Sequence, residues 1–327
     1  MLRRRGRNIV MLGIENTMEE TQLSEAELKM VDDFSQKIDL KDSAFILQYG
    51  TASQKKVAAF SDSALEKACS KALDGTDEML TDLVEELKDF SAAEEAKGGF
   101  FGFFKKTGDK IARMKERYSR VEENIDRITE ALEGHQNQLL TDIVMLDKMY
   151  EANLKYYKEL TMYTMAGRKR LKQERTETLP AMQEKARISG QALDAQAADD
   201  FAALCEQFDK KLYDLELTQT ISIQTAAQIK MIQNNNVLIS EKIQSAINNT
   251  IPLWKNQMVL ALDRAHSKQA MEAQKKASEL NDDLLRNTNE QLISALDEVR
   301  RIEDEDTQKR REAKSEIDRL KSGKMTF

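Results

Sequence analysis

The chain has little proline, cysteine, histidine or aromatic residue, and each shortage excludes a class of protein. Two prolines, two cysteines and two histidines occur in 327 residues, and aromatic residues make up only 6%. Proline is common in turns and is not tolerated inside helices. The shortage of proline therefore argues against a protein of many short elements joined by turns. Cys69 and Cys205 lie far apart, which excludes a disulfide framework and fits a reducing compartment.

Groups that perform catalysis or bind metals are also scarce. His135 and His266 have no set of cysteines or carboxylates beside them at the spacing of metal ligands. Asp263 lies one turn before His266, a spacing more typical of ordinary helix surface. The glycines within 98–102 lack the Lys-Ser/Thr pair of a phosphate-binding loop. We therefore expect a protein that is not an enzyme and that uses no cofactor and no metal.

Long apolar runs and a basic surface are both missing. No run approaches the ~18 apolar residues of a membrane-spanning helix, and the net charge of −7 argues against a nucleic-acid binder. Residues 1–20 are interpreted as a disordered basic tail, or as the product of an upstream start codon with Met11 or Met18 as the true start, in preference to an export or membrane-surface signal. The expected location is the cytoplasm, with membrane association as an alternative, and not outside the cell.

A third of the residues are charged, and apolar residues recur at steps of three and four, which together are typical of long helices. The predicted fold is all-α, an elongated antiparallel bundle of long coiled-coil-like helices with a smaller N-terminal helical part. That part occupies 21–97, a Phe/Gly-rich joint follows at 98–108, the long-helix bundle spans 109–321, and 322–327 form a tail.

The N-terminal part contains recognisable start and stop signals. Ser24 and Glu27 form a capping box, so a helix should begin there. Asp42 or Ser43 should start the next helix, and Gly50 should interrupt it before helix resumes toward residue 72.

Three long helices are expected beyond the joint, over about 109–164, 199–247 and from Pro252 onward. Gly167, with the basic stretch 168–172, predicts a break or bend, and a weaker helix should follow Pro180. The segment 250–258 is interpreted as a corner between the second and third helices, because proline suits a first helical turn. Trp254 should be at least partly buried, as an apolar wedge at this corner. The apolar face of the third helix should include Leu253, Leu262, Leu280, Leu284, Val299, Ile302, Ile317 and Leu320.

Amides crowd the middle of the second long helix, where a simple bundle would place Leu and Ile. Buried amides need partners or cost about 1–3 kcal/mol each. We favour polar layers that set helix register over a polar pocket or partner-binding groove. His135 is similarly interpreted as part of a polar layer. The amides concerned are Gln219, Gln224, Gln228, Gln233, Asn234, Asn235 and Asn236.

The strings Gln-Ile-Lys-Met-Ile-Gln-Asn-Asn-Asn at 228–236 and Ile-Pro-Leu-Trp-Lys-Asn-Gln at 251–257 closely resemble the toxic anion resistance family, the TelA-like proteins linked with tellurite resistance. Segments at 48–62, 140–142 and 208–215 are similar as well. The family pattern has proline and arginine where Ala227 and Lys230 stand here. Lysine lacks the planar fork of arginine, which weakens the case for a planar-anion site. The resemblance implies an all-helical cytoplasmic protein of anion or envelope-stress resistance, and it supplies no catalytic residues.

Two functions follow as hypotheses. The first is a non-catalytic helical scaffold or adaptor in a toxic-anion (tellurite) or envelope-stress resistance system, which acts through protein partners and does not bind nucleic acid. The alternative is a protein that binds an oxyanion or small ligand directly. A concave polar pocket around Gln228, Lys230 and Asn234 would favour the alternative. The residues of this ligand or register cluster are Gln228, Lys230, Gln233, Asn234, Asn235, Pro252, Trp254, Lys255, Asn256 and Gln257.

The aromatic segment 100–106 is the best candidate for a contact outside the chain. Its rings either cap the end of the bundle, the favoured interpretation, or meet a membrane surface or partner protein. The residues concerned are Phe100, Phe101, Phe103, Phe104, Lys105 and Lys106. The basic stretch 168–172 and the acidic stretch 303–306 are expected to be solvated helix faces or bends.

Overall fold

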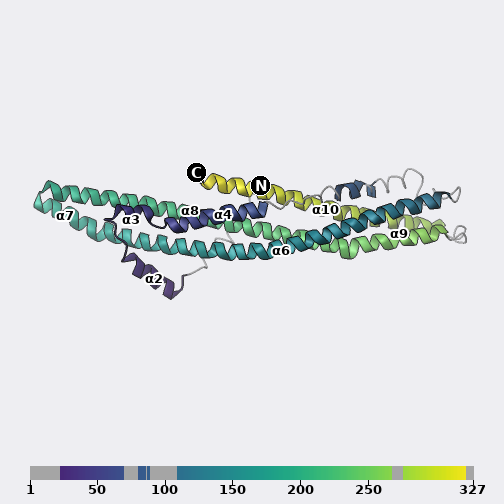
Figure 1. The fold of residues 1–327 in the computed structure, drawn as a ribbon, viewed down its shortest axis with the longest axis horizontal. Helices are drawn as coiled ribbons and strands as arrows, with labels where there is room; N and C mark the ends of the chain where they lie inside the picture. The colour runs from purple at the N-terminus through teal and green to yellow at the C-terminus, as the bar shows by residue number, and fades with distance from the viewer. Residues whose placement is uncertain (1–22, 70–79, 86, 89–108, 267–274, 322–327) are drawn as a thin grey trace. The chain divides into compact units, whose positions relative to one another are not determined.

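Every secondary-structure element in the part of the chain that the structure describes is a helix. The computed structural model describes residues 23–69, 80–85, 87–88, 109–266 and 275–321. The prediction of an all-α fold with long, mutually packed helices is confirmed. The elements, shown in Figure 1, are α2 (Glu25–Ser35), α3 (Ser43–Gln48), α4 (Thr51–Cys69), α6 (Asp109–Gln173), η2 (Glu174–Thr178), α7 (Leu179–Ser189), α8 (Ala192–Ser245), η3 (Ala246–Thr250), α9 (Ile251–His266) and α10 (Lys275–Lys321).

Packing divides the chain into two compact units, and each of α6, α8 and α10 contributes to both. Unit 1 comprises Met1–Ala68, Leu146–Met231 and Arg310–Phe327, and unit 2 comprises Cys69–Met145 and Ile232–Lys309. Each unit has its own hydrophobic core.

The first two N-terminal helices begin where the sequence predicts. Ser24 and Glu27 form a complete capping box at the start of α2. The carboxylate of Asp42 accepts hydrogen bonds from the first backbone N–H groups of α3. Gly50 has φ +68°, a conformation that favours glycine, and it separates α3 from α4.

The predicted break at Gly167 is wrong, because α6 continues through it to Gln173. A Cβ at Gly167 would lie 2.4 Å from Cδ2 of Leu212 and 3.2 Å from the ring of Phe208. The glycine therefore allows α8 to approach α6 closely, and it does not mark a turn.

The predicted corner at Pro252 is also wrong. The backbone passes from α8 through η3 into α9 without leaving helical conformation. In η3, a five-residue π-helix, the N–H of Ile251 bonds to the carbonyl of Ala246, five residues back. This wider turn makes room for the proline ring, which would otherwise clash with a carbonyl of the preceding turn. Pro180 follows the π-helix η2 in the same way.

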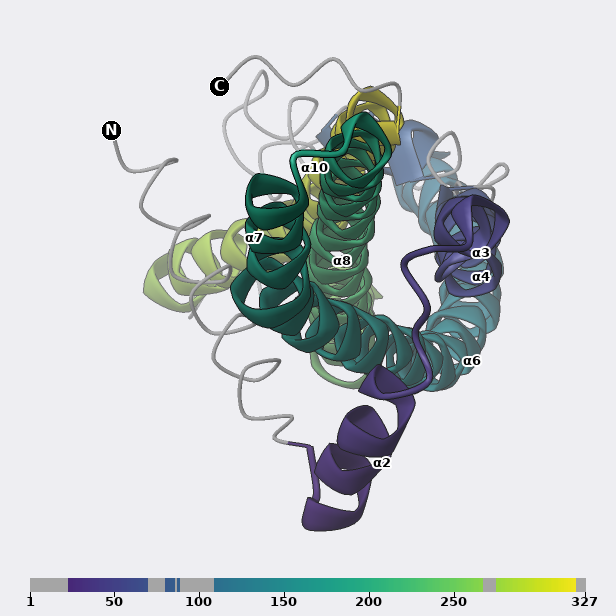
Figure 2. The ribbon, with the colours of Figure 1, turned by 90° about the vertical axis from the view of Figure 1, so that its left-hand side faces the viewer.

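In unit 1, α6 and α8 run antiparallel. Arg168 on α6 contacts Glu216 on α8, and further back along α6 Lys230 of α8 contacts Asp147. The chain reverses at Gly190, where φ is +61°, between α7 and α8, as Figure 2 shows. The core between them, with α2, α3 and α4, contains Ile46, Tyr49, Val57, Leu160, Leu171, Phe201, Phe208, Leu212 and Leu215.

In unit 2, α6 meets η3, α9 and α10, together with the helical residues 80–85 and 87–88. The expected core positions Val299 and Ile302 are buried, whereas Leu253 and Leu284 are more than 40% exposed, which corrects the predicted stripe of the third helix. The core includes Leu83, Leu87, Tyr118, Val121, Ile125, Ile128, Leu132, Ile239, Ile243, Trp254, Met258, Leu292 and Leu296.

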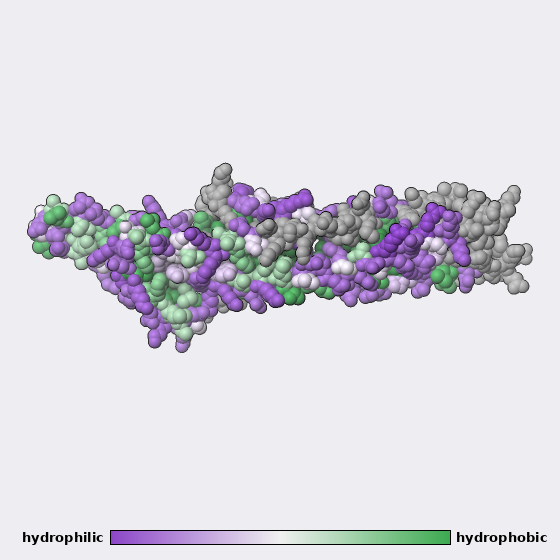
Figure 3. Space-filling model, viewed as in Figure 1, coloured by the Kyte–Doolittle hydropathy of each residue, from purple (hydrophilic) through white to green (hydrophobic). Residues whose placement is uncertain are grey.

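The visible surface of the described residues is mainly hydrophilic, with apolar side chains in small separate groups, as Figure 3 shows. Among the helices that the structure describes, none is both long and apolar enough to cross a bilayer.

Candidate functional site

Polar side chains on α8 in unit 1 are bonded to neighbouring helices. Asn153 of α6 donates from Nδ2 to the carbonyl of Ser222 at 2.8 Å and accepts from its hydroxyl at 3.0 Å. The hydroxyls of Ser61 and Thr225 lie 2.9 Å apart. Each of these bonds joins two different helices, so these groups form buried polar layers between them.

Lys230 lies on the surface of unit 1 with its charge already balanced. Its Nζ is 3.3 Å from Oδ1 of Asp147 and 4.5 Å from the centre of the Tyr150 ring. A carboxylate and an aromatic face both stabilise an ammonium group. Gln228, two residues earlier, is half-buried. Lys230 therefore serves as a contact between α8 and α6.

The remaining amides of the 228–236 string belong to unit 2. Gln233 and Asn236 are buried, Asn234 is exposed, and Asn235 donates from Nδ2 to Oδ1 of Asp306 on α10 at 2.5 Å. The cluster predicted from the sequence therefore does not converge on one point. Its members point from one helix toward different neighbours, as expected when successive residues are 100° apart.

His135 also belongs to a polar layer of unit 2. Its Nε2 lies 2.9 Å from Oε1 of Glu303 on α10, and both side chains are largely buried. The acidic stretch 303–306 is thus only in part the solvated face that the sequence predicts: Asp304 and Glu305 are exposed, but Glu303 and Asp306 are only 7% and 4% exposed. Charged side chains are rarely buried unless they have partners, and the polar partners lie on α6 and α8.

The segment 251–257 positions one large side chain in the core of unit 2. Trp254 is fully buried, as predicted, and its Nε1 donates to Oδ1 of Asn289 at 2.9 Å. The amide of Asn289 in turn donates to the carbonyl of Leu87 at 3.0 Å. One asparagine thereby joins α9, α10 and the segment around residue 87.

The other polar residues of this segment lie toward the surface. Lys255 forms an ion pair with Asp126 of α6. Pro252 and Asn256 are exposed, and Gln257 is half-buried. Sequence reasoning missed Asn289, because a single asparagine in a charged helix carries no local signal.

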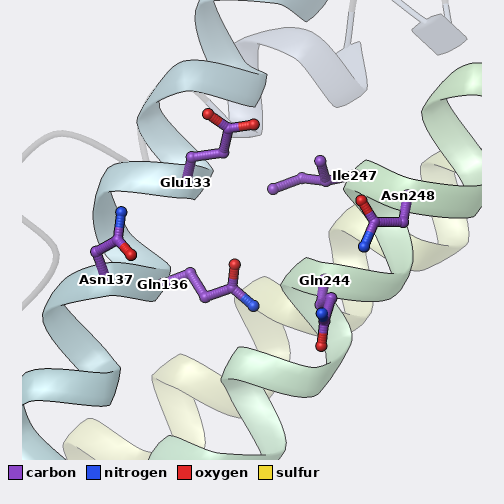
Figure 4. A pocket seen from close by; sticks show the side chains of 6 residues that line it. All are labelled: Glu133, Gln136, Asn137, Gln244, Ile247 and Asn248. Atoms are coloured by element: carbon purple, nitrogen blue, oxygen red, sulfur yellow. The ribbon is translucent and has the colours of Figure 1, made fainter.

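A polar cavity of about 270 Å³ lies between α6 and the end of α8 in unit 2. Figure 4 shows Glu133, Gln136 and Asn137 on α6 facing Gln244, Ile247 and Asn248. The lining has one carboxylate, four amides and no cation. Its chemistry suits hydrogen-bonding or positively charged groups better than an oxyanion, which needs donors and positive charge. The sequence did not single out these residues, because each resembles ordinary helix surface.

The basic stretch 168–172 has exposed lysines, Lys169 and Lys172, but Arg168 contacts the neighbouring helix α8. Arg168 donates to both oxygens of Glu216 at 2.8 and 2.9 Å and pairs with Asp209. Arg175 also pairs with Asp209, at 2.9 Å. Burial alone would raise the pKa of Asp209, but the hydrogen bonds from the two arginines outweigh it and lower that pKa. This network joins α6 and η2 to α8.

Cys205 is a core residue, as predicted, with 1% of its surface exposed. Burial raises the pKa of its thiol, which reduces the reactive thiolate form. Within the described residues, no group of three or more histidine, cysteine, aspartate or glutamate side chains is arranged to hold a metal ion. The aromatic segment 100–106 lies outside the described residues.

Comparison with known proteins places these features in a family. The model of the toxic anion resistance protein family (TelA) matches residues 31–292. This chain belongs to the TelA family. A TelA-like protein of Staphylococcus epidermidis is 33% identical, with the match covering 92% of this chain and 88% of the relative. A TelA-like protein of Staphylococcus aureus is 34% identical over 90% of this chain and 80% of its own. No solved structure matches the chain.

Membership of the TelA family links the chain with toxic anion resistance, and the resemblance predicted from the strings at 228–236 and 251–257 is confirmed. In each string one side chain bonds to α10: Asn235 to Asp306, and Trp254 to Asn289. These two residues of the TelA strings therefore contribute to the assembly of the bundle.

Proposed function

We propose that this protein is a non-catalytic helical scaffold that contributes to toxic-anion resistance, including resistance to tellurite, by binding protein partners. Family membership supports the link with toxic anions. The observation that carries the scaffold role is the engagement of the family strings in helix–helix contacts, with Lys230 held by Asp147, Asn235 by Asp306 and Trp254 by Asn289.

The same contacts support a scaffold over direct anion binding. A site for an oxyanion needs several donors that converge on one point and remain available to it. Here Lys230 is neutralised by a carboxylate, and the neighbouring amides point toward different helices. The polar cavity of unit 2 is lined by a carboxylate and amides, which would repel an anion or hold it weakly.

Thiol chemistry has little support from Cys205. A buried thiol with a raised pKa is a poor nucleophile toward an oxidised tellurium species. We therefore propose that resistance depends on the shape and surface of the protein and not on a cysteine.

Two measurements test this function, one in the native cell and one on the purified protein. Replacing Cys69 and Cys205 together by alanine should leave tellurite resistance nearly intact, with circular dichroism as the check on folding. Titration of the purified protein with tellurite should give no heat of specific binding, and Lys230→Met should leave that result unchanged. Loss of resistance in a folded double-cysteine variant would point to thiol chemistry. Tellurite binding that Lys230→Met abolishes would establish the anion-binding alternative.

A further inference from the structure

The outer face of the α6–α8 pair in unit 2 carries two exposed stripes of side chains. In each stripe, successive residues are four, three and four positions apart. This spacing keeps side chains on one helix face and is the spacing that packed helices use in their contacts. All eight side chains are exposed. We call them the outer seam: Glu133, Asn137, Leu140 and Val144 on α6, and Val237, Glu241, Gln244 and Asn248 on α8 and η3.

The two stripes lie beside each other. Gln136 of α6 donates from Nε2 to the carbonyl of Ser240 at 3.1 Å, which sets the alignment of the antiparallel helices. Glu133 and Asn137 consequently face Gln244 and Asn248 across the polar cavity (Figure 4). About one turn beyond Gln136, at Leu140, the α6 stripe reaches the level of Val237.

The end of the outer seam away from the cavity is aliphatic. Leu140, Val144 and Val237 are 49%, 55% and 39% exposed. Isolated exposed aliphatic residues are common on protein surfaces. Here, however, three of them occupy the packing positions of two adjacent helices, where a further helix would bury them against its own apolar face.

The charges of the outer seam are acidic. Glu133 and Glu241 form no ion pair with any residue in the described part of the chain. By contrast, the nearby Lys242 is paired with Glu298, and Lys255 is paired with Asp126. The carboxylates of the seam are therefore available to a positively charged partner, and the amides of the cavity add hydrogen-bonding groups at the same end.

We propose that the outer seam binds an amphipathic helix of a partner protein, with leucine-like residues at heptad spacing and lysine or arginine beside them. This inference rests on the proposed function, because it names the partner surface of the scaffold. A second copy of this chain is a poorer occupant, since an identical seam offers no lysine or arginine to pair with Glu133 and Glu241. An anionic membrane would meet the same repulsion.

A pair of synthetic peptides provides the probe. One is a helical peptide with leucines at the four–three–four spacing and lysines beside them, and the other replaces every lysine by glutamate. Binding to the full-length protein is followed by fluorescence anisotropy at low and high salt. The lysine peptide should bind, and the glutamate peptide should bind at least about tenfold more weakly. High salt should lower the affinity of the lysine peptide.

Variants then locate the binding. The double variant Leu140→Ser with Val237→Ser should lower the affinity for the lysine peptide by about tenfold or more. Glu133→Gln with Glu241→Gln should weaken it several-fold and reduce its salt dependence. The matched control is Ile188→Ser with Leu193→Ser, which removes two aliphatic side chains that are 73% and 81% exposed in unit 1, and it should leave affinity unchanged. Circular dichroism confirms that each variant is folded.

Several results would overturn the proposal. These are equal affinity for the two peptides, unchanged affinity in the seam variants, or self-association of the protein that Leu140→Ser with Val237→Ser abolishes. A sharp gain in peptide affinity on removal of residues 1–22 would identify the basic N-terminal segment of the chain itself as the occupant. Tellurite resistance of the same variants is scored separately. If the seam variants lose peptide binding but keep tellurite resistance, this result supports the outer seam as a binding surface and counts against the proposed function.

Discussion

At the scale of single residues, a few side chains set how closely the helices approach. Gly167 allows Leu212 and Phe208 to reach the backbone of α6. Asn289 satisfies the indole N–H of Trp254 in the core of unit 2. Both residues lie in helices, where neither glycine nor asparagine is favoured. They therefore stabilise the fold through contacts with other helices and not through helix propensity.

Gly167→Ala should destabilise the protein, although alanine is the better helix former. Its Cβ would lie 2.4 Å from Leu212, and overpacking of this kind costs about 1–3 kcal/mol. The control is Gly134→Ala on the same helix, where a Cβ meets nothing within 4 Å. That change should add roughly 0.5–1 kcal/mol of stability. Urea unfolding midpoints measure both, and a stabilised Gly167→Ala would contradict the close approach.

Trp254→Ala should lower the free energy of unfolding by about 3–5 kcal/mol, because it empties a fully buried position. Asn289→Ala should cost about 1–3 kcal/mol, since it leaves the indole N–H unsatisfied. The double variant should lose less than the two single losses added together, because the residues share one hydrogen bond. Denaturant titrations provide the three values, and strict additivity would argue against the bond.

At the scale of elements, the two π-helices explain how long helices can contain proline. Pro180 and Pro252 each stand second in the α-helix that follows a five-residue π-helix. The wider turn removes the clash that proline would otherwise cause. The sequence shows the proline but not the hydrogen-bonding pattern before it. The same residues are therefore compatible with a continuous helix and with a corner.

Pro252→Ala should therefore change the free energy of unfolding by less than about 1 kcal/mol, although proline inside an ordinary helix costs about 3 kcal/mol relative to alanine. The comparison is Glu241→Pro, at an exposed position within α8, which should lose about 3 kcal/mol or more. Thermal and urea unfolding measure both. Stabilisation of several kcal/mol by Pro252→Ala would mean that η3 does not relieve the clash.

The capping box of α2 should make that helix sensitive to acid. Hydrogen bonds from Lys158, and then from the backbone and hydroxyl of Ser24, lower the pKa of Glu27 from 4.5 to about 2. A lowered pKa in the folded state means that the contribution is complete above the unfolded value and is lost as pH falls toward 2. The gap in stability between the parent and Glu27→Gln should be constant near pH 7 and shrink below pH 4.5. A gap that does not depend on pH would contradict this account.

At the scale of the whole molecule, the chain is an all-helical member of the TelA family with two separately packed units. Lys230, Asn235 and Trp254 of its family strings contact other helices. We therefore expect other parts of its surface to bind other molecules. The outer seam is one such surface. The aromatic segment 100–106, outside the described residues, is predicted from the sequence to be another.

Liposome flotation tests the aromatic segment. If it contacts membranes, binding should require anionic lipid, because each inserted phenylalanine contributes about 1–2 kcal/mol and each lysine about 1 kcal/mol. Replacing Phe100, Phe101, Phe103 and Phe104 by serine should then abolish flotation. Identical flotation of variant and parent would favour the end-cap interpretation.

The sequence alone determined the helical class, the family, the caps at Ser24 and Asp42 and the buried positions Val299, Ile302 and Ile317, because capping and apolar spacing are local signals. It identified the 228–236 amides as unusual and Trp254 as buried. Tertiary structure alone decided that Gly167 is a contact within a continuous helix and not a break, that Pro252 continues a helix, and that Glu303 and Asp306 are buried. The reason is physical: a glycine, a proline or a carboxylate has the same local preferences in either setting, and only the neighbouring helix determines whether it packs, turns or faces water.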